Sequence, residues 1–423
     1  MKNKKKDAVL RPNNSVGLLK GGWLEVRDGV KILHLNGSNY QMGYQLGFLL
    51  KDQYLKNRRA WFNFLEKMGI SYDDLVFIWN ELKDLIPIEY KNEMQGRADA
   101  VNLTFLEVAV IDMLYSAVTC VGMAAWGVAT VDGRIYHLRS ADGGLGLKDP
   151  VSEEYACKDQ FLIVRKPDNG YASVVIGLSI QVSAEGGVNE KGIGIGYTTV
   201  YKPDTTIHGI PEGIRQRMVL DHAENAEDAL NIISSNRTTC YTNIISDGKK
   251  NNAYVVEQSA NYSYYGTWND TIESKYPSWI IDHIIRRGNF FLNPTSAGLK
   301  DDVYKKSNFI RWLLSLFGLE KEYTYFIMIT HYKLLSKAIE KQWGKLDLNG
   351  TMEMLRSVYQ GKNSGFYSLV QRLGGQYSQV WHQWVICPET GDILVSFADG
   401  KKSAYKNPVH HFNMYDLINA QSP

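Results

Sequence analysis

Polar and apolar residues follow two different periods in the first part of the chain. Residues 23–35 alternate polar and apolar side chains, as a half-buried strand does. From residue 36 to 68 the apolar residues recur at helical spacing, after a turn and cap near Ser38. Helical patterning returns over residues 88–116, with a break before Thr104 that again resembles a helix cap. The first 116 residues are therefore predicted to form a strand followed by helices.

From residue 121 the pattern changes to short strands joined by tight turns. Turn signals at Asp132-Gly133, Asn169-Gly170 and "NEKG" (residues 189–192) predict three successive hairpins. Further elements follow along the chain: a helical region at 211–234, a hairpin at 240–259, helices at 307–318 and 324–341, and a closing strand pair at 378–400. No alternation of strand and helix typical of a parallel sheet is present. The order predicts an α+β domain with two antiparallel sheets and no linker that would divide it.

Composition and charge narrow the classes of function. The 423 residues carry a formal net charge of +2, which gives no field that would attract nucleic acid or an acidic membrane surface. We expect residues 1–22, which begin with the basic run "KNKKK", to be a disordered tail. That run lacks the apolar segment of a secretion signal, and no stretch is long enough to predict a membrane-spanning helix. We therefore expect a cytoplasmic protein.

The four cysteines are candidates for chemistry that must be considered one by one. They lie far apart, with no CxxC pair and no spacing typical of zinc sites. A disulfide framework is not expected in a chain of this size, and no metal site is predicted. Burial as small apolar side chains accounts for Cys157, Cys240 and Cys387. Cys120 is different, because polar residues accompany it.

Cys120 lies where the helical pattern gives way to the first hairpin. The hairpin returns through its Asp132-Gly133 turn and brings Arg139 and Asp142 back beside Cys120. A neighbouring arginine lowers the pKa of a thiol and so favours the nucleophilic thiolate. The carboxylate could hold an ammonium group or orient Arg139. An ordinary salt bridge between Arg139 and Asp142 is the alternative interpretation of the same pattern.

The segment "CVGMAAWGVATVDGRIYHLRSAD" (residues 120–142) resembles the start of the catalytic chain in cysteine N-terminal-nucleophile hydrolases. The branch that contains acyl-CoA:6-aminopenicillanate acyltransferase is the most similar. Further resemblances occur in the same order along the chain, from about residue 36 to 400: "GSNYQMGYQLG", "GGVNEKGIGIGYTTV", "HGIPEGIRQRMVLDHAENAEDAL" and "NIISDGKKNNAYVVE". The resemblance implies a four-layer αββα fold and acyl transfer at C–N bonds.

The resemblance also implies how the chain would become active. Self-cleavage between Thr119 and Cys120 would leave residues 23–119 as a helical pro-region, and residues 120–423 as the catalytic core. The new α-amine, with a pKa of about 7.7–8.0, would serve as the base for the thiol. Arg139 and Asp142 would hold this terminus, and no metal or organic cofactor would be needed.

Two departures from the family pattern stand out. Thr119 occupies the position before the nucleophile, where relatives have glycine. A later T-N-H motif keeps only Asn289, and Thr198 and Thr199 stand where several relatives have an oxyanion-binding asparagine. We take Asn289 and Thr199 as candidates for the oxyanion hole.

The resemblance implies a small N-acyl substrate, with acyl-CoA as one possible acyl donor. Trp126 and Tyr197 are candidate walls of an apolar pocket for an uncharged acyl group. A papain-like mechanism is an alternative, in which a histidine such as His137, His382 or the pair at 410–411 is the base. The third hypothesis is a binding protein that has the fold but no catalysis.

Overall fold

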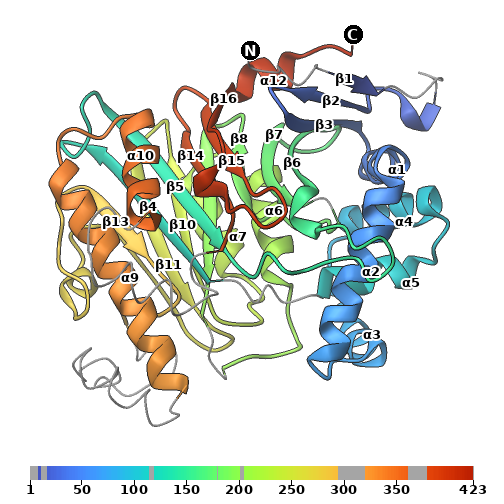
Figure 1. Cartoon of the computed structure of the whole chain (residues 1–423), viewed down its shortest axis with the longest axis horizontal. Coiled ribbons are helices and arrows are strands. Elements are labelled where there is room, and N and C mark those ends of the chain that lie inside the picture. The colour runs from blue at the N-terminus through green and yellow to red at the C-terminus, as the bar shows by residue number, and fades with distance from the viewer. Residues whose placement is uncertain are drawn as a thin grey trace.

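Two β-sheets lie face to face at the centre of the molecule, between layers of helices (Figure 1). This computed structural model describes residues 8–10, 17–113, 119–178, 180–200, 204–293, 320–360 and 379–422. The four-layer α+β architecture implied by the family resemblance is therefore confirmed.

The smaller sheet has six strands and carries the start of the predicted hairpin. All of its neighbouring strands pair antiparallel. In spatial order it consists of β13 (Ile284–Arg287), β4 (Thr119–Gly127), β5 (Gly133–Asp142), β14 (Val380–Cys387), β15 (Asp392–Phe397) and β16 (His410–Asn413).

The larger sheet has ten strands. Its pairs are antiparallel except for the parallel pair of β3 and β6. In spatial order it consists of β1 (Ala8–Leu10), β2 (Trp23–Arg27), β3 (Val30–Gly37), β6 (Gln160–Pro167), β7 (Ser173–Leu178), β8 (Gly186–Asn189), β9 (Ile193–Thr199), β10 (Tyr241–Asp247), β11 (Asn252–Gln258) and β12 (Ser263–Gly266).

Helices bury the outer face of each sheet. α6 (Glu212–His222) and α7 (Ala226–Ser234) pack on strands β8 to β11 of the larger sheet, and α9 (Glu320–Gln342) and α10 (Leu348–Tyr359) cover the smaller one. α12 (Met414–Asn419) packs on β6 and β7. Short 3-10 helices occupy Gly17–Leu19, Val110–Met113, Ala156–Lys158, Thr271–Ser274 and Ala404–Lys406.

Five helices near the N-terminus form a separate group beside the larger sheet (Figure 1). They are α1 (Asn39–Leu49), α2 (Lys51–Lys67), α3 (Tyr72–Leu82), α4 (Ile88–Val101) and α5 (Phe105–Ala109). α1 and α4 cross closely because glycines face each other's backbone. A Cβ added at Gly43 would come 2.0 Å from the Glu93 carbonyl oxygen, and one at Gly96 would come equally close to that of Tyr40.

A buried ionic cluster joins this helical group to the rest of the molecule. Glu93 of α4 forms an ion pair with Arg165 of β6 and lies 3.5 Å from the guanidinium of Arg217 on α6. Arg217 also donates to Asp221 at 2.9 Å. All four side chains are buried, so the charges compensate one another within the protein.

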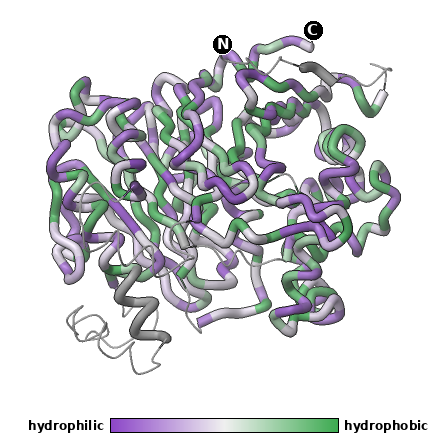
Figure 2. The backbone as a smooth tube through the Cα atoms, in the orientation of Figure 1, coloured by the Kyte–Doolittle hydropathy of each residue, from purple (hydrophilic) through white to green (hydrophobic). Residues whose placement is uncertain are grey.

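Many local predictions are confirmed. Hairpins turn at Gly133, Gly170 and Gly192, each with positive φ, and Ser38 and Thr104 begin α1 and α5 through capping boxes. Apolar and polar positions alternate along the central strands (Figure 2). The predicted helix at 307–318 and the end of the one at 88–116 lie outside the described residues.

Two predictions about the N-terminal region need correction. Residues 8–10 of the expected disordered tail form β1, which pairs with β2 from Ala8↔Val26 to Leu10↔Leu24. The expected helical pro-region, residues 23–119, also supplies β2 and β3 to the larger sheet. The reason is the strand-like alternation of residues 23–35, which buries Ile32, Leu33 and Leu35 in that sheet.

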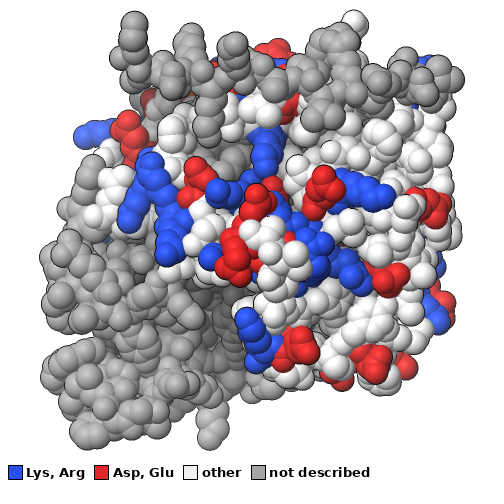
Figure 3. All heavy atoms as spheres, turned by 45° about the vertical axis from the view of Figure 1, so that its right-hand side comes forward, with Lys and Arg blue, Asp and Glu red and all other residues white. Residues whose placement is uncertain are grey.

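The surface agrees with the near-zero net charge. Lysine and arginine side chains are interspersed with aspartate and glutamate on the face drawn in Figure 3. Among the described helices, none combines the length and the apolar character needed to cross a bilayer.

Candidate active site

Cys120 lies at the start of β4, between two strands that bring the other polar residues to it. Its side chain is 1% exposed. The register of β4 with β13, from Ile284↔Ala125 to Arg287↔Gly122, carries the chain onward so that Asn289 faces Cys120. On the other side, Ala141 of β5 is opposite Cys120, and β9 of the larger sheet packs across β4.

Asn289 holds the backbone of the candidate nucleophile. The Cys120 backbone N–H donates to Asn289 Oδ1 at 2.7 Å. The Asn289 amide nitrogen donates in turn to the Thr199 carbonyl oxygen at 2.7 Å. These two contacts fix the orientation of the amide, since only its oxygen can accept from Cys120. The oxygen of Asn289 therefore faces the nitrogen that self-cleavage would convert into an amine.

The loop that carries Asn289 is itself anchored. Glu257 of β11 accepts hydrogen bonds from the backbone N–H groups of Leu292 at 2.9 Å and Asn293 at 3.0 Å. Arg287 donates to Glu257 at 2.8 Å and forms an ion pair with Glu273 at 2.5 Å. This buried cluster fixes residues 287–293 on both sides of Asn289.

Arg139 connects the thiol to three other groups. Its Nη2 donates to Cys120 Sγ at 3.4 Å, and its Nε donates to the Tyr197 carbonyl oxygen at 2.8 Å. The guanidinium also lies over the Tyr197 ring, 4.3 Å from its centroid. Nη1 lies 3.0 Å from His382 Nε2. The pairing of Gly122 with Arg139 makes this geometry possible, because a glycine leaves room for the guanidinium beside Cys120.

The contact with Arg139 determines the protonation of His382. Arginine can only donate, so Nε2 of His382 must accept and its proton must lie on Nδ1. Nδ1 then donates to Gln160 Oε1 at 2.9 Å, while the Gln160 amide nitrogen donates to two backbone carbonyls. Burial, with the Arg139 charge, holds the pKa of His382 well below its usual value. His382 is therefore a neutral acceptor that positions Arg139.

The thiol of Cys120 is protonated at neutral pH in the uncut chain. Burial raises its pKa to about 11, although the positive charge of Arg139 acts in the opposite direction. The negative charge of Asp142 contributes to the increase. A nucleophilic reaction at this thiol therefore needs a base that removes the proton.

Asp142 lies on the other face of the smaller sheet. It is three residues from Arg139, and successive side chains in a strand point to opposite faces. Its carboxylate accepts from Ser140 Oγ and from the hydroxyl of Tyr359 on α10, each at 2.6 Å. Burial raises its pKa to about 7. The structure thus brings the guanidinium, but not the Asp142 carboxylate, into hydrogen-bonding contact with the thiol, and places Asp142 opposite Thr119 in the strand pair.

The remaining candidate residues divide between the site and the core. Tyr197 and Thr199 lie beside the site through the contacts of their carbonyl oxygens with Arg139 and Asn289. Trp126 does not line the cavity that Tyr197 borders. It is six residues along β4, about 20 Å from Cys120 at roughly 3.3 Å per residue. Its ring is buried in an apolar cluster with Ile135, Ile244 and Ile285, so its role is packing.

The alternative histidines do not reach the thiol. His137 is opposite Ala124, about 13 Å along the strand from Cys120, and its Nδ1 pairs with Ser246 Oγ at 2.9 Å. Burial lowers the pKa of His137 to about 3. His410 and His411 lie on β16, four strands from β4, which corresponds to about 19 Å. Among the described residues, no group of three or more His, Cys, Asp and Glu could hold a metal ion.

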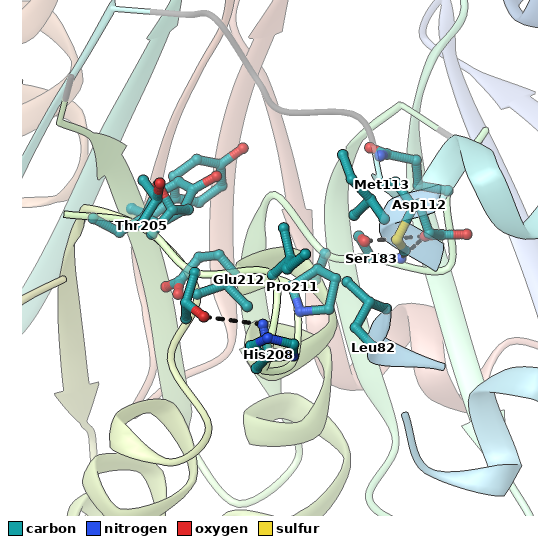
Figure 4. Close-up of a pocket in the computed structure, with 18 of the residues that line it drawn as sticks. Leu82, Asp112, Met113, Ser183, Thr205, His208, Pro211 and Glu212 are labelled. Atoms are coloured by element: carbon teal, nitrogen blue, oxygen red, sulfur yellow. Dashed lines mark hydrogen bonds between the residues drawn. The ribbon is translucent and has the colours of Figure 1, made fainter. Parts of the chain in front are cut away.

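A cavity of about 550 Å³ adjoins this cluster (Figure 4). Tyr197 and Glu185 form part of its wall, and the Glu185 carboxylate lies 4.0 Å from His382 Nε2. The Arg139 charge acts to lower the pKa of Glu185, against the larger effect of burial, which raises it. The sequence analysis did not identify Glu185, because the segment between β7 and β8 carries no local motif that relates it to Cys120.

Comparisons with known proteins were made against this geometry. The family described as "Acyl-coenzyme A:6-aminopenicillanic acid acyl-transferase" matches residues 155–276. An uncharacterized protein of Archaeoglobus fulgidus is 23% identical over 88% of this chain and 68% of its own length. Protein dcd1B of Dictyostelium discoideum is 27% identical over 54% of this chain, and the match spans half of that protein.

Two solved structures were found to be similar. An N-acylethanolamine-hydrolyzing acid amidase ortholog of Caenorhabditis elegans has a TM-score of 0.39 and 12% identity, over 70% of this chain and 99% of that one. Penicillin V acylase of Agrobacterium tumefaciens has a TM-score of 0.39 and 13% identity, over 71% and 88%. The match over residues 155–276 confirms the resemblance predicted from the sequence, to the family of acyl-coenzyme A:6-aminopenicillanic acid acyl-transferases.

Proposed function

We propose that this protein is an N-terminal-cysteine enzyme that hydrolyses or transfers the acyl group of a small N-acyl amide. The observation that carries the proposal is the arrangement around Cys120. Its buried thiol has the Arg139 guanidinium at 3.4 Å, while His382 is held as an acceptor and His137 is remote. The nitrogen of Cys120 itself is then the nearest group that could act as base once it is an amine.

Activation would begin with the thiol of Cys120 attacking the carbonyl carbon of Thr119. The C–N bond breaks, the Cys120 nitrogen takes up a proton, and Thr119 becomes a thioester on Sγ. Water then hydrolyses the thioester, which gives a Thr119 carboxylate and restores the thiol. Asp142, opposite Thr119 in the strand pair and with a pKa of about 7, is suitably placed to exchange the proton.

Turnover would use the same atoms. The free amine accepts the thiol proton, and the thiolate attacks the substrate carbonyl to form a tetrahedral oxyanion. Collapse expels the amine of the substrate, which receives the proton, and leaves an acyl thioester on Cys120. Water or a second amine then takes the acyl group. Asn289 would retain the new terminus by accepting from it, as it does from the peptide N–H.

Denaturing mass spectrometry of the purified full-length protein tests the proposal. We expect two fragments, residues 1–119 and 120–423, whose masses sum to that of the intact chain plus one water. The Cys120→Ala variant is the control and should remain one chain. A wild-type chain that stays intact while it turns over an N-acyl amide would refute self-cleavage and favour a cysteine–histidine mechanism.

A further inference from the structure

A buried carboxylate in the wall of the cavity has an oxygen without a partner. Asp112 lies in the 3-10 helix Val110–Met113 and is 2% exposed. Its Oδ1 accepts three hydrogen bonds, from the backbone N–H groups of Val182 at 2.8 Å and Ser183 at 3.2 Å, and from Ser183 Oγ at 3.1 Å. Its Oδ2 is buried and has no hydrogen-bond partner.

A buried carboxylate oxygen without a partner is costly, because it has lost its hydration without replacement. The charge that acts most strongly on Asp112 is that of Arg97, but this guanidinium is already engaged. It donates to the carbonyl oxygens of Ile180 at 2.8 Å and Gln181 at 3.3 Å and lies 3.6 Å from Glu93. Oδ2 therefore remains available to a donor that enters the cavity.

The cavity connects this oxygen with the reaction centre. Asp112, Met113 and Ser183 line one side of it, and Glu185 and Tyr197, which adjoin Arg139, line it as well (Figure 4). Ile78 and Leu82 add an apolar surface near Asp112. This lining differs from the expected apolar pocket for an uncharged acyl group, since carboxylates of Asp112, Glu185 and Glu212 contribute to it.

We propose that Asp112 Oδ2 binds a primary ammonium group on the substrate, so that the preferred substrates are N-acyl amides with a cationic amine distant from the scissile bond. This inference rests on the proposed function for the identity of the scissile bond. The Glu212 carboxylate does not compete for the ammonium group, because both of its oxygens accept hydrogen bonds from Asn243, Arg215 and Gln258. At about pH 7.5 Asp112 is ionised, since burial raises its pKa only to about 6.

Binding to the Cys120→Ala variant tests the inference without turnover. Two isosteric pairs are compared by calorimetry: 6-aminohexanoyl anilide with heptanoyl anilide, and the heptanoyl amide of 1,4-diaminobutane with that of pentylamine. Each pair differs by an ammonium group in place of a methyl group. We expect the cationic member of at least one pair to bind about tenfold more tightly or better, as for a charge-assisted hydrogen bond. Equal binding within both pairs would overturn the proposal.

Substitutions on the same background identify the group responsible. Asp112→Asn should abolish the preference and leave the neutral ligand bound as before, while Asp99→Asn, which removes an exposed carboxylate on α4, should preserve the preference. If Asp112→Asn binds neither ligand, Asp112→Glu decides: a restored preference supports the proposal, and its absence refutes it. Failure of self-cleavage would contradict the proposed function while leaving these binding results valid.

Discussion

Replacing Arg139 with methionine removes the positive charge beside the Cys120 thiol and keeps a long, flexible side chain in its place. At the observed separation of 3.4 Å, two unit charges interact by about 5 kcal/mol with an effective dielectric constant of about 20. The guanidinium charge is spread over several atoms, and Glu185 offsets part of it, so we take about half of this value. A loss of about 2–3 kcal/mol lowers the thiolate population about 30- to 150-fold.

The reaction of the thiol with a small disulfide reagent, such as 4,4′-dithiodipyridine, measures this effect. A thiolate becomes more nucleophilic as its pKa rises, with a Brønsted coefficient of about 0.4–0.5, which offsets part of the loss. The rate at Cys120 should therefore fall about 5- to 15-fold. Peptide mapping by mass spectrometry assigns the reaction to each cysteine, and the other three serve as internal controls.

The variant also leaves the Tyr197 carbonyl oxygen and His382 Nε2 without the donor that Arg139 supplies. Each loss costs about 1–3 kcal/mol of stability, so thermal unfolding must be measured alongside. A general loosening would accelerate all four cysteines together. An unchanged or faster rate at Cys120, with the other three unchanged, would refute the view that Arg139 stabilises the thiolate.

Three further predictions concern neighbouring residues. Cys120→Ala should abolish self-cleavage and turnover, as seen by intact mass and amide hydrolysis, whereas alanine at the other three cysteines should change only stability; loss of turnover in one of those alone would contradict the choice of nucleophile. His137→Gln should retain most of the activity, and normal self-cleavage with no turnover would instead favour a cysteine–histidine mechanism. For Asp142, burial raises the pKa to about 7, so the folded chain keeps a proton that the unfolded chain releases near pH 4, and this group's contribution to stability declines from about pH 4 to about pH 7. Asp142→Asn lacks this titration and should become more stable relative to the wild type over that interval; urea unfolding at about pH 4.5 and about pH 7.5 measures the difference, and a constant difference would contradict the assigned pKa.

The local elements could be predicted because short-range signals determine them. The Asp132-Gly133 turn defines the hairpin of β4 and β5, and that hairpin alone brings Arg139 near Cys120. Asp142 shows where such reasoning was incomplete. Its odd separation from Arg139 along a strand places the two side chains on opposite faces, so the sequence contained the signal, but proximity along the hairpin was taken as contact.

The residues that were missed depend on contacts between distant segments. Glu185 and Asp112 meet the site only because the two sheets stack and the helical group packs beside them. His382 was considered as a base, yet its contacts with Arg139 and Gln160 make it an acceptor. Hydrogen-bond partners of this kind follow from tertiary packing, for which a single sequence holds no periodic pattern.

The sharing of one sheet between the segments before and after Cys120 has a consequence for the behaviour of a cut protein. β3 pairs along its length with β6, and the Glu93 cluster lies across the same boundary. Two fragments joined in this way could not separate without opening a continuous hydrogen-bonded sheet and exposing buried charges. Dissociation would then be equivalent to denaturation, so dilution should not release the N-terminal fragment, and a melting temperature measured over a wide range of protein concentrations should stay constant.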